Sequence, residues 1–316
     1  MSELPNLIIT NQFHPETIAK LDEIYNTHHL WTLNPQKKLA LVQALKGSCS
    51  AVASASWTCD PVIYNLESLQ FIGCFGVGVD GVDFDKVASL NVKVSNTPGV
   101  LNDAVADIAI ALILGITRNI INADAYVRSK SWQNSGPFEF GQSLQGKTLG
   151  ILGLGRIGKA VAERALPLGL KIAYHNRHEQ KVPYSYMSSI DELASNSDIL
   201  LCMLPGGAET KHLINETVLR KLGHGGYFIN VGRGSSVDEL ALARALSEGQ
   251  IAGAGLDVYE NEPRVPDALL AQSNLILLPH IGSATEQTRM AMGQLVIDNL
   301  DAYFAKEPLL TEYHYR

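Results

Sequence analysis

The sequence has few cysteines and no cysteine motif. Its 316 residues include four, Cys49, Cys59, Cys74 and Cys202. None belongs to a Cys-x-x-Cys pair, which argues against zinc ribbons and thioredoxin-type redox sites. Four scattered cysteines do not make a disulfide scaffold in so long a chain. We therefore expect buried free thiols, no metal site and a reducing compartment, with the cytoplasm as the default.

The sequence also lacks long apolar runs and an excess of basic residues. The longest apolar run, residues 108–117, is far shorter than the ~20 residues of a membrane span. No Lys or Arg precedes Leu7, so the basic start of a signal peptide is missing. The net charge is −7, from 25 basic and 32 acidic residues. This balance argues against nucleic acid and acidic membranes as partners.

What is present is an alternation of strands and helices along a chain long enough for two domains of ~150 residues. Short β-branched runs alternate with helical stretches, which favours α/β domains with parallel sheets covered by helices on both faces. The polar, aromatic stretch 129–144 is expected to be a loop or arm. The predicted strands are residues 7–10, 51–53, 69–74, 92–95, 148–152, 171–174, 199–203, 227–231, 253–256 and 275–278. The predicted helices are residues 15–25, 35–46, 103–118, 156–166, 190–194, 215–221, 238–248 and 286–304.

The pattern Gly-x-Gly-x-x-Gly occurs twice, and its context separates the two copies. The second copy, residues 153–158, directly follows a predicted strand and opens a predicted helix, and the next strand ends close to 20 residues later. That arrangement is typical of dinucleotide binding, with the pyrophosphate held by free N–H groups at the helix start. The predicted contacts are Gly153 for the tight turn, Gly155 for close approach of the backbone, Gly158 for helix–strand packing, and Arg156 and Ile157 in the first helical turn.

The first copy, residues 76–81, contains Asp80 and is followed by a short segment with Asp83 and Asp85. Negative charge makes this a poor place for a pyrophosphate. The backbone N–H groups of Val77 and Gly78 could still hold a smaller anion such as a carboxylate. The alternative is a turn that serves packing alone.

The residues after strand 171–174 bear on the choice of cofactor. An NAD enzyme usually carries Asp or Glu here, to bind the ribose hydroxyls. This chain has the neutral Asn176 and no acid before Glu179. Arg177 can pair with a 2′-phosphate, and Lys181 adds a second cation. NADP(H) is therefore favoured over NAD(H). The alternative is that Arg177 lies in a solvated turn and the protein uses NAD.

Three segments near the ends of later predicted strands carry residues suited to chemistry. They are Arg233 in Asn-Val-Gly-Arg-Gly, Glu262 in Asp-Val-Tyr-Glu-Asn-Glu-Pro, and His280 in Pro-His-Ile-Gly-Ser. Ligands of open α/β sheets bind outside the carboxyl ends of the strands, so the three side chains are expected to converge on one cleft.

The second glycine turn and these three segments, in this order, resemble the D-isomer-specific 2-hydroxyacid dehydrogenase family over essentially the whole chain. Within it the similarity is greatest to NADPH-dependent glyoxylate/hydroxypyruvate reductases and their 2-ketoaldonate-reducing relatives. The resemblance implies a Rossmann dinucleotide-binding domain, residues 98–283, inserted into a flavodoxin-like substrate-binding domain, residues 1–97 and 284–316. A homodimer is also expected.

The expected reaction is reduction of a small 2-oxo acid by NADPH to a D-2-hydroxy acid. His280 is expected to donate the proton as general acid, since an imidazolium is competent near pH 7. Glu262 would orient the ring and favour its protonated form, and Arg233 would bind the substrate and stabilise the developing charge. The resemblance assigns the same roles. It further implies cofactor contacts for Leu204, Pro205, Thr210, Val231, Asp257 and Gly282, and substrate contacts for Val77, Gly78, Arg233 and His280.

Several alternatives remain at this stage. Glyoxylate and hydroxypyruvate are the expected substrates, and 2-ketogluconate or hydroxyphenylpyruvate would use the same site. A non-catalytic NAD(P)-sensing protein on this fold is the alternative of another class. Trp57 lines the substrate cleft or the core, and Trp132 in the arm reaches a partner subunit or solvent.

Overall fold

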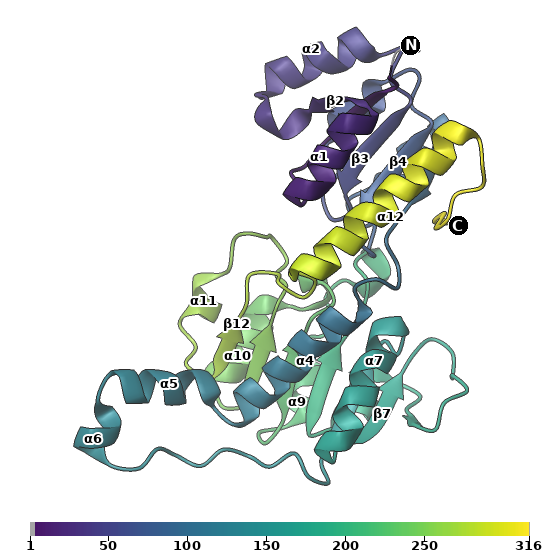
Figure 1. The fold of residues 1–316 in the computed structure, drawn as a ribbon. Helices are drawn as coiled ribbons and strands as arrows, with labels where there is room; N and C mark the ends of the chain where they lie inside the picture. The colour runs from purple at the N-terminus through teal and green to yellow at the C-terminus, as the bar shows by residue number, and fades with distance from the viewer. Residues whose placement is uncertain (1–3, 316) are drawn as a thin grey trace. The chain divides into compact units, whose positions relative to one another are not determined.

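The computed structural model describes residues 4–315, which form two compact units (Figure 1). The first unit contains the described residues up to Leu101 and those from Thr285 onward. The second unit is Asn102–Ala284. One unit is thus inserted into the other. The junctions differ by four residues and by one residue from those expected from the sequence.

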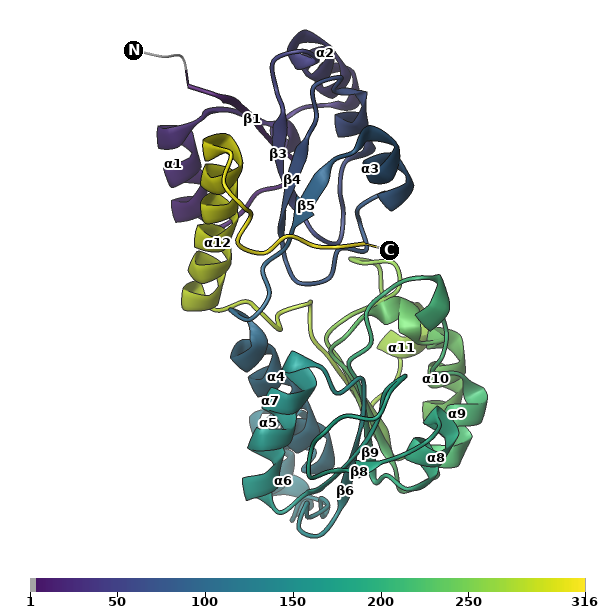
Figure 2. The same cartoon turned by 90° about the vertical axis from the view of Figure 1, so that its right-hand side faces the viewer.

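The first unit is a five-stranded parallel sheet in the order β2-β1-β3-β4-β5. Helices α1 and α12 cover one face and α2 and α3 the other (Figure 2). The last helix, α12, packs on β4 and α1, so the end of the chain completes the first unit. The strands are β1 (Asn6–Ile9), β2 (Asn26–His29), β3 (Ala51–Ala55), β4 (Phe71–Phe75) and β5 (Lys93–Ser95). The helices are α1 (Pro15–Ile24), α2 (Pro35–Leu45), α3 (Phe84–Leu90) and α12 (Glu286–Ala305), with the 3-10 turns η1 (Leu30–Thr32) and η2 (Pro61–Asn65).

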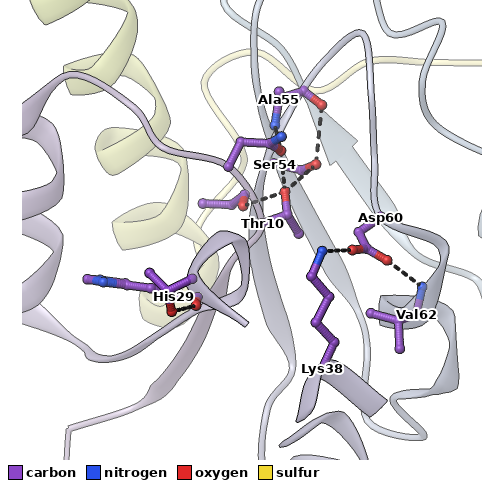
Figure 3. Close-up of polar contacts among 10 residues, drawn as sticks. Thr10, His29, Lys38, Ser54, Ala55, Asp60 and Val62 are labelled. Carbon is purple, nitrogen blue, oxygen red and sulfur yellow. Dashed lines mark hydrogen bonds and ion pairs between the residues drawn. The ribbon is translucent and has the colours of Figure 1, made fainter. Parts of the chain in front are cut away.

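A buried polar network closes the carboxyl ends of β1 and β3 (Figure 3). The hydroxyl of Thr10 donates to Oγ of Ser54 at 2.8 Å, and Ser54 donates to the carbonyl of Ala55. Nearby, Nζ of Lys38 lies 2.7 Å from a carboxylate oxygen of Asp60. Because buried polar groups are costly unless they are paired, these contacts fix the strand ends and the loops after them.

The second unit is a seven-stranded parallel sheet in the order β12-β11-β10-β9-β6-β7-β8. The almost wholly apolar helix α4 packs on α7 and on β10 and β11, as expected for a helix buried between layers. The strands are β6 (Thr148–Leu152), β7 (Lys171–His175), β8 (Ser185–Tyr186), β9 (Ile199–Cys202), β10 (Tyr227–Asn230), β11 (Gly253–Leu256) and β12 (Leu275–Leu277). The helices are α4 (Asn102–Thr117), α5 (Ile120–Arg128), α6 (Ser131–Ser135), α7 (Arg156–Ala165), α8 (Ile190–Ser195), α9 (Glu216–Leu222), α10 (Glu239–Ser247) and α11 (Asp267–Leu270), with the 3-10 turns η3 (Leu166–Leu168), η4 (Ala208–Thr210) and η5 (Gly234–Ser236).

The predicted fold class is confirmed, since both units are parallel α/β sheets. Among the described residues, six helices and strands were not predicted, namely β2, β8, α3, α5, α6 and α11. The stretch 129–144 is not wholly a loop, because it contains the short helix α6. Within residues 4–315 no single helix is long and apolar enough to cross a membrane, although the bent pair α4–α5 passes that test by length and composition.

Candidate active site

A cleft of about 600 Å³ opens in the second unit at the carboxyl edge of its sheet. The order in which strands are added to the sheet reverses between β6 and β9, where Leu152 pairs with Cys202. β7 and β8 extend the sheet on one side of β6, and β9 to β12 extend it on the other. Such switch points are where open α/β sheets bind ligands. Seven residues predicted to bind a cofactor line this cleft: Gly153, Gly155, Asn176, Arg177, Leu204, Pro205 and Thr210.

The glycine turn between β6 and α7 fits a pyrophosphate. Gly153 has a φ of +98°, a conformation that side chains disfavour. A Cβ on Gly158 would lie 2.8 Å from the carbonyl oxygen of Gly153, so a side chain there would part the helix from the turn. The space beside Gly155 is open. Within residues 4–315, no hydrogen bond occupies the backbone N–H groups of Arg156 and Ile157. These groups are therefore available to an anion.

The side chain of Asn176 holds the same turn from β7. Its Oδ1 accepts a hydrogen bond from the backbone N–H of Leu154 at 2.6 Å. The next residue, Arg177, is 87% exposed and places Nη1 3.3 Å from Oε2 of Glu209, which is 85% exposed. The mouth of the cleft therefore carries one cation, held by a weak surface ion pair that a competing anion can displace. Sequence analysis did not identify Glu209, which lies 32 residues further along the chain than Arg177.

Glu262 and His280 form an ion pair in which Oε2 of Glu262 and Nδ1 of His280 are 2.7 Å apart. The other oxygen of Glu262 accepts the backbone N–H of Tyr259 at 3.0 Å. Burial opposes ionisation of Glu262, but the hydrogen bond and charge of His280, the Tyr259 N–H and the charge of Arg233 together lower its carboxyl pKa. The carboxylate is therefore ionised near neutral pH and acts as a hydrogen-bond acceptor toward Nδ1 of His280.

Asp257 anchors the loop that follows His280. It is 1% exposed, and its two carboxylate oxygens accept the backbone N–H groups of Ile281 and Gly282, each at 2.7 Å. Burial is the largest influence and raises the pKa of Asp257, against the lowering effect of the two N–H donors. The structure thus gives this acid a positioning role that sequence reasoning did not predict.

Arg233 lies just beyond β10, on a backbone held by short contacts. Its carbonyl oxygen accepts Nδ2 of Asn230 at 3.0 Å and Oγ of Ser236 at 2.6 Å. The next residue, Gly234, packs so closely that a Cβ there would lie 1.8 Å from the carbonyl carbon of Tyr259. The Arg233 segment therefore lies directly on the segment that carries Glu262.

The remaining predicted residues fall at the ends of strands. Val231 is buried beyond β10, next in the sheet to Asp257 beyond β11, and Gly282 contacts Asp257 after β12. In the first unit, within the described residues, the half-exposed backbone N–H groups of Val77 and Gly78 make no hydrogen bond. Because these two donors are open, they fit the predicted carboxylate site.

The two tryptophans singled out in the sequence both lie outside the apolar cores. Trp57 follows β3 and is 43% exposed, so it is not a core residue. Trp132 lies in α6 and is 63% exposed.

A switch-point cleft with a glycine turn, together with a Glu–His pair beyond β11 and β12 of the same sheet, is typical of a nicotinamide-dinucleotide-dependent oxidoreductase. A family model agrees: residues 110–282 match the NAD binding domain of D-isomer specific 2-hydroxyacid dehydrogenases. The chain is 45% identical over 298 residues to a hydroxyphenylpyruvate reductase of Plectranthus scutellarioides, covering 92% of this chain and 93% of the relative. It is 42% identical over 299 residues to a glyoxylate/hydroxypyruvate reductase of Arabidopsis thaliana, with the same coverage.

A solved structure extends the similarity to the whole fold. The NADPH-dependent glyoxylate/hydroxypyruvate reductase of Sinorhizobium meliloti, solved with NADP and malonate, matches with a TM-score of 0.92 and 41% identity. The match covers 98% of this chain and 97% of that one. The chain belongs to the D-isomer-specific 2-hydroxyacid dehydrogenase family, which confirms the family predicted from the sequence and its enzyme class.

Proposed function

We propose that this protein reduces small 2-oxo acids, glyoxylate and hydroxypyruvate among them, to D-2-hydroxy acids with NADPH. The observation that carries the proposal is the 2.7 Å contact between Glu262 and His280, which lie beyond the ends of β11 and β12 in the same sheet as the dinucleotide cleft. That pair supplies a proton where the cofactor chemistry needs one.

Each side chain of the site has a defined task in the proposal. When bound, the reduced nicotinamide supplies a hydride to the carbonyl carbon. His280 donates a proton to the carbonyl oxygen, and Glu262 keeps the imidazole oriented through its contact with Nδ1. Arg233 binds the substrate and stabilises the negative charge that develops on that oxygen. In the first unit, the open N–H groups of Val77 and Gly78 bind the substrate carboxylate.

The preference for NADPH rests on the residues after β7. Asn176 is neutral and uses its oxygen on the glycine turn, so no carboxylate from this segment competes with a 2′-phosphate. The exposed Arg177 is free to exchange Glu209 for that phosphate, because the ion pair is weak. The remaining predicted contacts complete the cofactor site: Gly153, Gly155, Arg156, Ile157, Gly158, Leu204, Pro205, Thr210, Val231, Asp257 and Gly282.

The 45% identity to a hydroxyphenylpyruvate reductase favours a second candidate substrate on the same site. The decisive experiment follows NADPH and NADH consumption with glyoxylate, hydroxypyruvate, hydroxyphenylpyruvate, 2-ketogluconate and pyruvate. Turnover with the first two and NADPH supports the proposal, and a strong preference for hydroxyphenylpyruvate or 2-ketogluconate would reassign the substrate. No consumption of either cofactor with any of these substrates, together with measurable NADPH binding, would favour a non-catalytic NAD(P)-sensing protein.

The role of His280 is tested in the same assay. His280→Ala should abolish turnover while NADPH still binds, as measured by fluorescence titration. A variant with near-normal rates would contradict the general-acid assignment.

We also propose a homodimer in a reducing compartment such as the cytoplasm. The arm formed by α5, α6 and the residues after them exposes large apolar side chains that a monomer would leave in water: Ile120, Ile121, Val127, Trp132 and Phe140. Exposed apolar patches of this kind mark interaction surfaces. Sedimentation equilibrium of the chain and of Trp132→Ser tests this, because a monomeric wild type would contradict it.

A further inference from the structure

Three segments of the second unit meet around Glu260, two residues before Glu262. The backbone N–H of Glu260 donates to Oε1 of Glu239 at 2.9 Å. Both carboxylate oxygens of Glu260 lie 3.1 Å from Nε2 of His212. Nζ of Lys211 lies 3.5 Å from the same carboxylate. Glu260 is therefore held at its backbone by α10 and at its side chain by the segment before α9.

Glu239 is a nearly buried acid, and the charge of His212 helps to stabilise its ionised form. It is 6% exposed, and its described hydrogen bond is the one it accepts from Glu260. Burial, the largest influence, raises the pKa of Glu239. Moving an acid out of water costs free energy, which a specific contact can offset. The contact described for Glu239 is with the Tyr259–Glu262 segment, through the backbone N–H of Glu260.

His212 connects the same segment to the dinucleotide cleft. It directly follows η4 and Lys211, and both Thr210 and Leu213 line the cleft. Its backbone N–H donates to the carbonyl of Ser235, in the turn after Arg233. It also has a φ of +51°, which is uncommon for a residue other than glycine and indicates that its position is imposed by its contacts.

We propose that Glu239 and His212 are positioning residues for the hydride-transfer site: by holding Glu260 from two sides, they fix the segment that presents Glu262 to His280. This inference rests on the proposed function, because it takes His280 as the general acid. Neither residue touches the reacting atoms. Their effect is to keep the Glu262 carboxylate at hydrogen-bond distance from Nδ1 of His280, where a small displacement is costly in rate.

The test compares two substitutions of Glu239 that differ in one property. Glu239→Ala removes the acceptor for the Glu260 N–H, whereas Glu239→Gln keeps an acceptor oxygen and removes the charge. We expect Glu239→Ala to lower kcat by about tenfold or more, with a smaller change in the KM for NADPH. Glu239→Gln should restore kcat to near the wild-type value. Glu163→Ala, which changes an exposed acid on α7, is the matched control and should leave kcat unchanged.

The pH profile separates positioning from a purely structural effect. A carboxylate in contact with an imidazole stabilises the protonated ring, and displacing Glu262 would remove the 2.7 Å contact with Nδ1 of His280. The alkaline limb of kcat/KM for oxo-acid reduction should therefore move to lower pH in Glu239→Ala and return in Glu239→Gln. The charged or titratable groups near Glu239, Glu260 and Glu262, these acids included, are Lys211, His212, Arg233, Asp257, Tyr259, Glu260, Glu262 and His280.

A second pair of variants keeps the test decisive if Glu239→Ala does not fold. In His212→Asn the new side chain suits the left-handed backbone but is too short to reach Glu260. This variant should therefore move the alkaline limb of kcat/KM to lower pH, as Glu239→Ala does. A folded Glu239→Ala or His212→Asn with wild-type kcat and pH profile would overturn the proposal, as would equal damage in Glu239→Ala and Glu239→Gln. Glu262→Gln and His280→Ala are run beside them. If those two change neither rate nor profile, the proposed general acid fails, and that result is distinct from failure of the positioning role.

Discussion

Oδ1 of Asn176 accepts the backbone N–H of Leu154 at 2.6 Å, so the residue directly after β7 holds the glycine turn that follows β6. An aspartate could make the same contact through either oxygen. The neutral amide keeps the turn in place without adding a negative charge to the cleft that Asn176 lines.

Asn176→Asp should therefore raise the KM for NADPH by about tenfold, equivalent to ~1.4 kcal/mol, because a carboxylate repels the 2′-phosphate. The KM for NADH should change little or fall. Steady-state kinetics with both cofactors measure the ratio. Asn176→Ala is the control. It should weaken the binding of NADPH and NADH alike, because it removes the acceptor for the backbone N–H of Leu154. If Asn176→Asp leaves the ratio of the KM values for NADPH and NADH unchanged, residue 176 does not lie near the 2′-phosphate.

Arg177→Ala should raise the KM for NADPH far more than that for NADH, since a guanidinium pairs with the phosphate that NADH lacks. The salt dependence of the NADPH KM should also weaken. Lys181→Ala, four residues away and exposed, is the matched control with a smaller effect. Equal effects of Arg177→Ala on the two cofactors would remove Arg177 from the phosphate site.

Gly234→Ala should be strongly disruptive, because its Cβ would lie 1.8 Å from the carbonyl carbon of Tyr259. Overpacking typically costs about 1–3 kcal/mol, and backbone has less freedom to move than a side chain. We expect a lower melting temperature and a loss of kcat, as Arg233 and Glu262 shift apart. Gly225→Ala is the control, since nothing lies within 4 Å of the Cβ it would add. Equal melting temperatures for the two variants would contradict the close packing.

The Glu262–His280 pair should make the free energy of unfolding depend on pH in the acid range. The pKa of Glu262 is lowered in the folded protein. Its contribution to the free energy of unfolding is therefore fully present above the ordinary glutamate pKa of ~4.3 and is lost as pH falls through the lower folded value. The melting temperature of wild type should approach that of Glu262→Gln across this acid range. A difference between them that is constant down to pH 3 would argue against the pair.

Local patterns predicted most of the fold, and the reasons for the failures are physical. The glycine turn at 153–158 was predictable because strand, turn and helix are adjacent in the sequence. The strands β2 and β8 were missed because each lies at a sheet edge with one neighbour, and neither has a β-branched run. The helix α5 was missed because it has no buried residue to produce an apolar stripe.

The site divides in the same way. Arg233, Glu262 and His280 lie in short motifs, and the predicted partnership of the last two is present as a 2.7 Å contact. The contacts that hold them in place join residues far apart in sequence, as between Asp257 and Gly282 or Glu239 and Glu260. A single sequence contains no signal for such pairs.

The insertion of one unit into the other sets an order of synthesis. All of Asn102–Ala284 is synthesised before α12, so every strand of the second unit is made while the first unit still lacks the helix that packs on β4. Domains generally fold as units as the chain emerges. Until that last long helix is made, one face of the first unit's sheet is covered by α1 alone.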